Sequence, residues 1–245
     1  MKFAKKDILY EDMSVLVCRK ASGMAVQSAG PGKMDLESTL KNYLAVKNPG
    51  KGIPYLGVVQ RLDQPVEGLL VFALTKKAAA SLSRQTAEGR IEKIYMALVR
   101  ASLEPGQSGE LAHWLKKEGR RSVVVESGTQ GGKQARLSYK VLAEKDGKSL
   151  LLVRLHTGRY HQIRCQLARE EMPIVGDILY GQGETRMGGI GLCACRLAFD
   201  HPDTGRRMVF AVRPEHDSFQ FLSGFLNTLV VPEKNIYNAV NMEYE

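Results

Sequence analysis

The sequence predicts an α+β fold built around a mixed, largely antiparallel sheet. Three observations carry this prediction: short strand-like runs recur along the chain, helical periodicity separates only some of them, and Pro, Asp and Gly stand between consecutive runs. A parallel sheet would instead require a helix between nearly every pair of strands, because parallel strands need a long crossover connection.

Each predicted strand is a short run of mostly apolar or β-branched residues. The predicted strands are Ser14–Cys18, Leu69–Leu74, Ile94–Val99, Arg136–Leu142, Leu150–Leu155 and Met208–Val212. Hairpin turns are expected at "EKDGKS" (144–149) and "HPDTGRR" (201–207), since Pro, Asp and Gly between apolar runs favour tight turns.

Helices are predicted where apolar residues recur every three or four positions. The predicted helices are Leu36–Val46, Lys76–Glu88 with Thr75 as its cap, Tyr160–Glu170, and Ser218–Leu226. The stretch 182–191, "QGETRMGGIG", is expected to be a Gly-rich loop. With no internal repeat, we expect a single domain over residues 1–230 and a polar tail over 231–245.

The charge balance favours a polyanionic partner. The chain of 245 residues carries 35 Lys and Arg against 26 Asp and Glu, a net charge of +9. Nucleic acid is therefore the first partner to test, although a basic soluble protein without such a partner would have the same composition. There is no signal-peptide pattern and no apolar run long enough to span a membrane, so we expect a cytoplasmic location and no membrane partner. Nothing in the sequence indicates an obligate protein partner.

Cysteine spacing does not indicate a metal site. Cys193 and Cys195 form a C-x-C pair, and the other two cysteines, Cys18 and Cys165, are far from it in the sequence. A structural zinc site commonly needs a second ligand pair, so we predict reduced, partly buried cysteines and no metal.

The segment "QRLDQPVEG" (60–68) places Arg61 and Asp63 between two apolar runs. If both runs are buried strands, the segment is a loop at a sheet end, where a carboxylate can face a cleft. The alternative is that Asp63 only bonds backbone amides in a turn next to Pro65. Spacing alone leaves both interpretations open.

A second segment, "TGRYHQIRCQLA" (157–168), supplies a possible partner for Asp63. On a helix, Ile163 and Leu167 would form the buried stripe, with Arg164 half buried at its border and His161 one turn earlier. A half-buried guanidinium needs a carboxylate, because Arg cannot lose its proton. Asp63 is one candidate; solvent, Glu170 and Glu171 are the others.

A third segment, "RIEKIYMALV" (90–99), alternates Lys93, Ile94 and Tyr95 on a predicted strand. Most tyrosines in such a position complete a core. In a basic protein, an aromatic ring beside a cation is also a common way to stack on an extruded RNA base.

Taken together, the three segments resemble the RluA family of RNA pseudouridine synthases. The family's R-L-D segment followed by Gly-Leu-Leu is Arg61-Leu62-Asp63 with Gly68-Leu69-Leu70, its G-R-x-H-Q-I-R segment is residues 158–164, and its K-x-Y-x-A segment is residues 93–97. Similar segments at 8–23, 173–181 ("PIVGDILYG") and 191–205 extend the resemblance over roughly residues 7–215.

The resemblance implies a pseudouridine synthase fold, in which a deep central cleft cuts a mixed sheet, and a set of site residues. Asp63 would be the catalytic carboxylate, Arg164 its ion-pair partner and Tyr95 the ring against the uracil. Arg61 would help displace the target base, and the other substrate-binding residues would be Lys93, Arg159 and His161. The reaction needs an anionic nucleophile or base, so no metal or other cofactor is expected. The partner would be RNA, either ribosomal or transfer RNA. No separate N-terminal RNA-binding module is seen before Asp7, so recognition would depend on the catalytic domain, with "LKKEGRR" (115–121) as a candidate RNA contact or simply a solvated face.

Several positions depart from the family pattern. Gln60 stands where His is usual, Glu67 where Ser is usual, Ala21 where Pro is usual and Tyr160 where Thr is usual. A Glu67 pointing into the cleft would repel RNA phosphates, and we expect it to point outward or to pair with an Arg.

Three other functions stay open at this point. The first is a catalytically impaired RNA-binding paralogue. The second is a hydrolase that uses Asp63 and Glu67 as a carboxylate pair, which the positive charge of the chain disfavours. The third is a serine or cysteine hydrolase, which is weaker because no G-x-S-x-G motif occurs.

Overall fold

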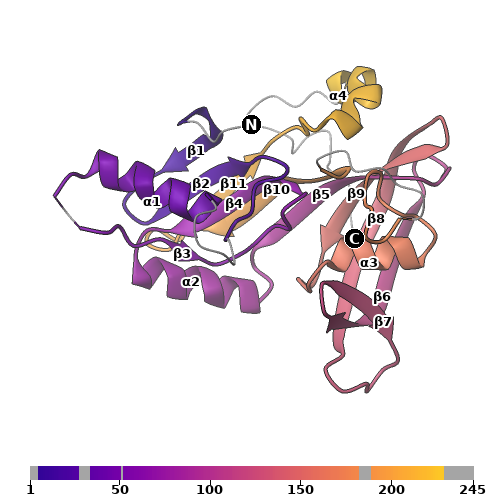
Figure 1. The fold of residues 1–245 in the computed structure, drawn as a ribbon, viewed down its shortest axis with the longest axis horizontal. Coiled ribbons are helices and arrows are strands. Elements are labelled where there is room, and N and C mark those ends of the chain that lie inside the picture. The colour runs from indigo at the N-terminus through magenta and orange to yellow at the C-terminus, as the bar shows by residue number, and fades with distance from the viewer. Residues whose placement is uncertain (1–4, 28–33, 51, 182–188, 229–245) are drawn as a thin grey trace.

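The structure is a computed structural model that describes residues 5–27, 34–50, 52–181 and 189–228 (Figure 1). The strands are β1 (Ile8–Glu11), β2 (Val15–Lys20), β3 (Gly57–Val58), β4 (Glu67–Ala73), β5 (Glu92–Val99), β6 (Ser108–Glu118), β7 (Arg121–Val125), β8 (Lys133–Lys145), β9 (Lys148–Leu155), β10 (Leu192–Asp200) and β11 (Arg207–Ala211). The helices are α1 (Leu36–Lys47), α2 (Lys76–Ala87), α3 (Gln162–Arg169) and α4 (Ser223–Thr228), with 3₁₀ helices at Lys5–Asp7 and Asp217–Leu222.

In the described part of the chain, the strands form one sheet in the order β1-β2-β4-β10-β5-β9-β8-β6-β7, with β3 paired to β4 and β11 paired to β10. The pairing of β4 with β10 is parallel, and the other strand pairs are antiparallel. The predicted α+β class with a mixed, largely antiparallel sheet is confirmed.

Both predicted hairpins are present. The turn between β8 and β9 contains Asp146 and Gly147, each with a positive φ, as a two-residue turn of the mirror-image type requires. Thr75 caps α2 as predicted, because its hydroxyl accepts a hydrogen bond from the amide of Ala78 at 3.1 Å.

Two predicted helices differ from the structure. The helix predicted over Tyr160–Glu170 is α3, which begins at Gln162, because His161 has a left-handed backbone (φ 50°) that does not fit an α-helix. The segment predicted as one helix over Ser218–Leu226 is divided into a 3₁₀ helix, Asp217–Leu222, and α4. The predicted tail over 231–245 and most of the predicted loop over 182–191 lie outside the described residues.

Helices α1 and α2 cover opposite faces of β2 and β4. Alternate strand residues explain this arrangement, because successive side chains in a strand point to opposite faces. One face carries Leu16 and Phe72 against α1, and the other carries Val17 and Val71 against α2. The strands are buried on both sides, so β4 is apolar at nearly every position and does not alternate.

The other half of the sheet, β5 to β9, has its own core. Tyr95, Leu137 and Val153 face Ile163 and Leu167 of α3. The stripe predicted for this helix is thus confirmed, and Figure 1 shows α3 lying beside the strands β6 to β9. The opposite face of β5 and β9 packs against Phe219 and Leu226 near the C-terminal end of the described chain.

The two halves meet where β4 contacts β10. Gly68 pairs with Ala194 there and has φ 125°. A Cβ atom at position 68 would lie 2.4 Å from the carbonyl oxygen of Ala194. Only glycine permits both this backbone conformation and this close approach.

Candidate active site

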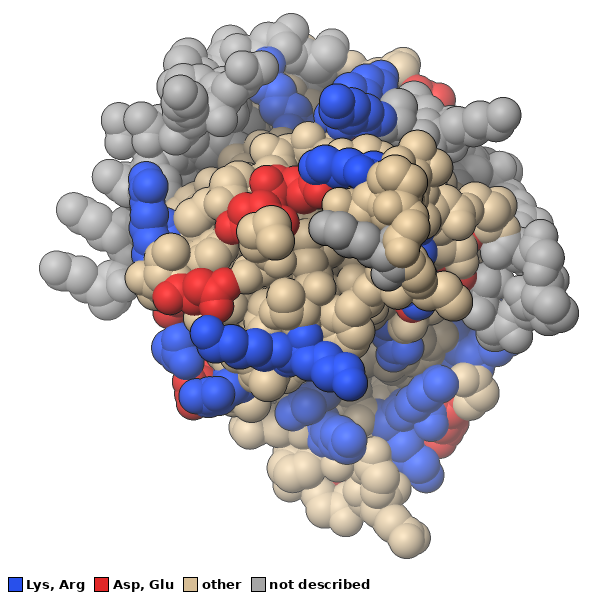
Figure 2. All heavy atoms as spheres, turned by 90° about the vertical axis from the view of Figure 1, so that its left-hand side faces the viewer, with Lys and Arg blue, Asp and Glu red and all other residues tan. Residues whose placement is uncertain are grey.

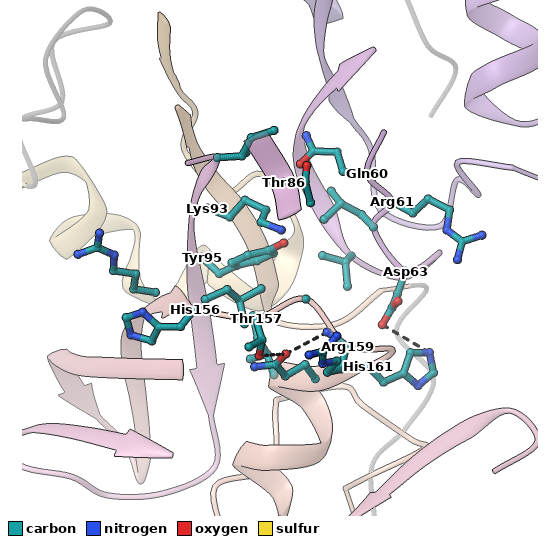
Figure 3. A pocket seen from close by; sticks show the side chains of 18 of the residues that line it. Gln60, Arg61, Asp63, Thr86, Lys93, Tyr95, His156, Thr157, Arg159 and His161 are labelled. Atoms are coloured by element: carbon teal, nitrogen blue, oxygen red, sulfur yellow. Dashed lines mark hydrogen bonds and ion pairs between the residues drawn. The ribbon is translucent and has the colours of Figure 1, made fainter. Parts of the chain in front are cut away.

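A cavity of about 580 Å³ opens between the two halves of the sheet (Figure 3). It is lined by the loop between β3 and β4, by the segment from the end of α2 into β5, and by the segment from the end of β9 into α3. All seven predicted site residues line it, namely Arg61, Asp63, Lys93, Tyr95, Arg159, His161 and Arg164. The flanking apolar runs are indeed strands β3 and β4, so Asp63 lies in a loop at a sheet end, as predicted.

Arg164 holds Asp63 in the cavity wall. Its Nη1 atom lies 3.0 Å from Oδ2 of Asp63. The rest of the guanidinium is bound by Asp177, whose two carboxylate oxygens accept hydrogen bonds from Nε at 2.7 Å and Nη2 at 2.8 Å. The predicted pair with Asp63 is therefore present, and neither Glu170 nor Glu171 replaces it.

Arg164 is more deeply buried than the predicted half-buried position, with 5% of its surface exposed. Burial alone would lower the pKa of Arg164, but its hydrogen bonds with Asp177 and the charges of Asp177 and Asp63 raise it on balance. The guanidinium is a fixed positive charge in the wall behind Asp63.

His161 is the second contact of Asp63. Its Nε2 atom lies 3.5 Å from Oδ2 of Asp63, and its Nδ1 atom lies 3.0 Å from the hydroxyl of Tyr180. Burial lowers the pKa of His161 to about 4, an effect that Asp63 opposes and Arg164 reinforces, so the ring is neutral at pH 7.

The hydrogen-bond network assigns the tautomer of His161. The amide of Ser122 donates to the hydroxyl oxygen of Tyr180 at 2.7 Å, and we assign the Tyr180 proton to the hydrogen bond with Nδ1 of His161, because Nε2 faces a carboxylate that can only accept. The single ring proton then lies on Nε2, facing the Asp63 carboxylate. Both described contacts of the carboxylate reach Oδ2, so Oδ1 has no partner among the described residues, and Asp63 lines the cavity.

Lys93 and Tyr95 form the wall opposite Asp63 (Figure 3). They lie two residues apart on β5, so both side chains point to the same face of the sheet. Burial, together with the charge of Asp63, raises the pKa of Tyr95, and burial lowers the pKa of Lys93. The buried tyrosine keeps its proton and offers a flat apolar face to a ligand.

Arg61 and Arg159 lie at the edge of the cavity and are exposed. Figure 3 shows that the guanidinium of Arg61 is directed away from Lys93 and Tyr95. Arg159 is tethered, because its Nε atom donates to the carbonyl oxygen of Gln134 at 2.8 Å and its amide donates to Gln162 at 2.9 Å.

Glu67 does not point into the cavity. It is 3% exposed, and its carboxylate pairs with Arg19 at 3.0 Å and accepts hydrogen bonds from the amides of Glu215 (2.9 Å) and His216 (3.0 Å). The expected pairing with an Arg is confirmed, although the side chain is buried rather than outward. Glu67 is absent from the described cavity wall, so the proposed carboxylate pair of a hydrolase with Asp63 is wrong.

Lys20 supports the loop that carries Asp63 from behind. Its ammonium is fully buried and donates to the carbonyl oxygens of Ala21 (3.0 Å), Met24 (2.8 Å) and Gln64 (3.1 Å). Burial lowers the pKa of Lys20 to about 7, against the charges of Asp63 and Glu67. The backbone next to Asp63 is thereby fixed to the end of β2.

Three residues of this network were not predicted from the sequence: Asp177, Tyr180 and Lys20. Asp177 and Tyr180 lie in "PIVGDILYG" (173–181), which resembled the family without an assigned role. The predicted burial of Arg164 could have indicated a second acidic partner such as Asp177, since a buried guanidinium has five N–H donors and one carboxylate cannot accept from all of them.

Among the described residues, no group of three or more His, Cys, Asp or Glu side chains is arranged to hold a metal ion. Cys18, Cys165, Cys193 and Cys195 are free and buried, more completely than the predicted partial burial. None of the described helices is both long and apolar enough for a membrane span.

The chain resembles known proteins in sequence. The family model described as RNA pseudouridylate synthase matches residues 14–169. A ribosomal large subunit pseudouridine synthase D of Xylella fastidiosa is 36% identical over 176 residues, which cover 71% of this chain and 51% of that protein. An uncharacterized RNA pseudouridine synthase of Aquifex aeolicus is 30% identical over 247 residues, covering 90% of this chain and 72% of that protein. The chain thus spans about half the length of the Xylella relative.

Solved structures share the fold. The structure titled human RNA pseudouridylate synthase domain containing 4 superposes with a TM-score of 0.74 at 20% identity, covering 89% of this chain and 92% of that one. The structure titled human RNA pseudouridylate synthase domain containing 1 gives a TM-score of 0.68 at 23% identity, over 95% and 99% of the two chains. At these identities the likeness supports the fold alone.

Proposed function

Because this chain belongs to the RNA pseudouridylate synthase family, we propose that it isomerises uridine in RNA to pseudouridine, with Asp63 as the catalytic carboxylate. One observation carries the assignment of Asp63. Its Oδ2 atom is bound by Arg164 and lies 3.5 Å from Nε2 of His161, its Oδ1 atom has no partner among the described residues, and the cavity that it lines has Tyr95 in the opposite wall.

The other acidic residue of the cavity wall is engaged elsewhere. Among the described lining residues, Asp63 and Glu92 are the acidic ones. Glu92 pairs with Arg196, and Arg207 lies 3.8 Å from its second oxygen. Asp63 is therefore the carboxylate that we assign to the chemistry.

The reaction requires an anionic group beside C1′ of the target nucleotide. The bond between N1 and C1′ breaks, the uracil rotates, and a bond between C5 and C1′ forms; C5 loses a proton and N1 gains one, so no electrons are exchanged with a third compound. In our proposal Arg164 and the Nε2 proton of His161 hold Asp63 in position while Oδ1 acts as nucleophile or base. The neutral ring of His161 orients the carboxylate without adding a second positive charge.

The cavity wall suits a flipped-out base. Extruding a uridine from a folded RNA costs a few kcal/mol of stacking, which stacking on an aromatic ring and phosphate contacts can offset. We assign the ring of Tyr95 to the uracil face, Lys93 to its polar edge, and the exposed Arg61 and Arg159 to the RNA strand on either side.

Positive charge extends beyond the cavity. Exposed Lys76, Lys77 and Arg84 lie on α2, whose C-terminal end lines the cavity through Thr86 and Ala87. Figure 2 shows the end of the molecule that carries α1 and α2, with Lys and Arg side chains gathered in its lower half. We propose that this surface contributes electrostatic attraction to the RNA backbone.

We propose ribosomal RNA as the first substrate to test, ahead of transfer RNA, because relatives in several bacteria bear the name ribosomal large subunit pseudouridine synthase D. We further propose that residues 1–230 work as one catalytic domain, and that the protein acts in the cytoplasm, where its RNA substrate would be. The continuous sheet from β1 to β7 supports the single domain.

The test is tritium release from cellular RNA labelled at C5 of uridine and prepared from cells that lack this protein. We expect release by the wild-type protein and its loss in Asp63→Asn, with RNA binding retained. Glu92→Gln is the matched control, because it neutralises the other carboxylate of the cavity wall and is expected to keep most of the activity. Tight RNA binding without release by the wild type would instead favour the alternative, an RNA-binding paralogue without activity. An equally inactive Glu92→Gln would refute the choice of Asp63 over Glu92.

A further inference from the structure

An exposed aromatic ring lies at the rim of the cavity, directly on a residue of the site. The ring of Tyr160 stacks on the ring of His161 with a centroid distance of 3.9 Å and an interplanar angle of 21°. Tyr160 is 40% exposed, one of the few large apolar side chains that the described structure leaves in solvent. Its position is not explained by the hydrophobic core.

The hairpin of β6 and β7 fixes Tyr160 in place. The hydroxyl of Ser122 on β7 donates to the carbonyl oxygen of Tyr160, and the amide of Ser122 donates to Tyr180, which in turn contacts His161. The backbone of Tyr160 is therefore held by the same residue that helps to orient His161. A ring with a fixed position and one exposed side loses little entropy when a ligand stacks on it.

A cation lies over the ring, and two further exposed cations follow it in the sequence. The ammonium of Lys117 lies 4.8 Å from the centroid of the Tyr160 ring. Lys117, Arg120 and Arg121 are exposed, and no salt bridge joins them to an acidic residue in the described part of the chain. The acidic residue of this turn, Glu118, lies 3.9 Å from Lys116 instead.

We propose that Tyr160 is a stacking platform for an unpaired RNA base outside the catalytic cavity, with Lys117 and Arg120 binding the adjoining phosphates. This inference rests on the proposed function, because it places a neighbour of the target nucleotide at the rim of the cavity. It also gives the segment "LKKEGRR" a role as an RNA contact rather than a solvated face.

A base can displace the Lys117 ammonium from the ring. A cation over an exposed aromatic ring is worth about a two- to fivefold change in an equilibrium constant, whereas a base stacked on an aromatic side chain is worth about 5- to 150-fold. The displaced ammonium of Lys117 stays beside the Tyr160 ring, where it can form an ion pair with a phosphate of the same RNA strand. Stacking and phosphate binding thus favour the same bound state.

The test compares two single-stranded ten-nucleotide probes with the same number of phosphates, an oligouridylate and its fully abasic counterpart. Fluorescence anisotropy would measure binding to the wild type, Tyr160→Ala, Tyr160→Trp and Tyr55→Ala. Tyr55→Ala is the matched control, because Tyr55 is 41% exposed and lies outside the cavity wall.

We expect Tyr160→Ala to weaken oligouridylate binding about 5- to 150-fold and to leave the abasic probe within twofold. Tyr160→Trp should bind at least as tightly as the wild type, and Tyr55→Ala should match the wild type on both probes. Equal affinity of the wild type for the two probes, or an unchanged affinity in Tyr160→Ala, would overturn the inference.

Lys117→Gln tests the phosphate contact separately. For single strands, each lost phosphate contact should reduce the slope of log Kd against log salt concentration by about 0.7, on both probes. An unchanged slope would refute the assignment of Lys117.

Steady-state kinetics on cellular RNA distinguish a binding role from a merely structural one. A stacking platform predicts that Tyr160→Ala raises KM and largely preserves kcat, whereas a residue that only holds His161 in place would lower kcat with KM unchanged. A failure of the proposed function is recognisable on its own, because the wild type would then release no tritium while still discriminating the two probes.

Discussion

Replacing Asp177 by Asn tests whether a residue behind the cavity wall determines the position of Asp63, the carboxylate that we propose as catalytic. Asp177 is fully buried and shares two hydrogen bonds with Arg164, at 2.7 and 2.8 Å. The substitution preserves the size of the side chain and removes its charge. One amide oxygen can still accept from Arg164, while the amide NH₂ group faces a guanidinium that has no acceptor to offer.

The expected cost follows from the burial of both partners. Breaking a buried ion pair by removing one partner typically costs about 3–5 kcal/mol, because the remaining charge is left without compensation. Asn retains one of the two hydrogen bonds and Arg164 retains Asp63, so we expect the lower end, about 3 kcal/mol of unfolding free energy. Arg164 would also lose its fixed orientation, and we expect kcat to fall at least about tenfold.

Urea denaturation at pH 7, combined with tritium release, measures both effects. With a denaturant slope of about 3 kcal/mol per molar, the loss moves the unfolding midpoint down by about 1 M urea. Asp146→Asn is the control: Asp146 lies in an exposed turn with a positive φ that Asn adopts readily, and no measurable shift is expected. A variant of Asp177 with an unchanged midpoint and unchanged kcat would refute the anchoring role.

Three further predictions concern single side chains near the site. Burial lowers the pKa of His161 to about 4, so between pH 6.5 and pH 4 the unfolded chain binds a proton that the folded chain does not. The free energy of unfolding therefore falls as the pH falls through this window. The variant His161→Asn, whose side chain also tolerates φ 50°, should lose less stability than the wild type between pH 7 and pH 4.5, as measured by urea titrations. Glu67→Ser should destabilise the fold by about 2 kcal/mol, since it leaves Arg19 with one carboxylate partner fewer. Turnover should change less than about tenfold. A larger rise in turnover would contradict the placement of Glu67 outside the cavity. Gly68→Ala should cost at least about 3 kcal/mol or prevent folding, because its Cβ would overlap the backbone of Ala194, and thermal unfolding or the soluble yield would show this.

Strands were predicted correctly where the composition changes sharply at both ends of the strand. Strands without such a change in composition were not predicted. Strand β10 (Leu192–Asp200) escaped prediction because it is buried on both faces, and its Cys-Ala-Cys-Arg sequence shows no alternation. Strand β6 (Ser108–Glu118) escaped for a different reason: it alternates exposed and partly buried residues and contains Lys, Glu and His, so its apolar run is too short and too interrupted to indicate a strand.

The candidate site was predictable for residues within recognisable segments and not for their supports. Asp63 and Arg164 lie 101 residues apart; the charge requirement of a buried Arg made Asp63 one of several candidate partners, and the resemblance to the RluA family implied that pair. That Arg164 also binds Asp177, and that His161 begins α3 with a left-handed backbone, depends on how the segment 170–181 turns back on the helix. Local propensity contains no information about such a turn.

The strand order also has a consequence for how the protein folds. The strand pairs within β1, β2 and β4 and those within β5 to β9 join shorter stretches of chain, the longest being Val15 with Ala73 and Ile94 with Arg154, so each of these two groups can form on its own. The strand that joins them, β10, pairs with β4 across more than 120 residues of chain. Closing the longer loop costs somewhat more conformational entropy, so we expect this pairing to form after the pairings within each group.

The cavity lies at that joint, with Asp63 in the loop before β4 of the first group and Arg164 on α3 after β9 of the second. During synthesis, a chain that has not yet reached residue 200 would have both groups of strands but not the strand that fixes their distance. We therefore expect nascent or truncated forms to retain secondary structure while lacking the pairing of Asp63 with Arg164. The proposed activity would then depend on the final joining of the sheet, so that only a completely folded chain would have an assembled cavity.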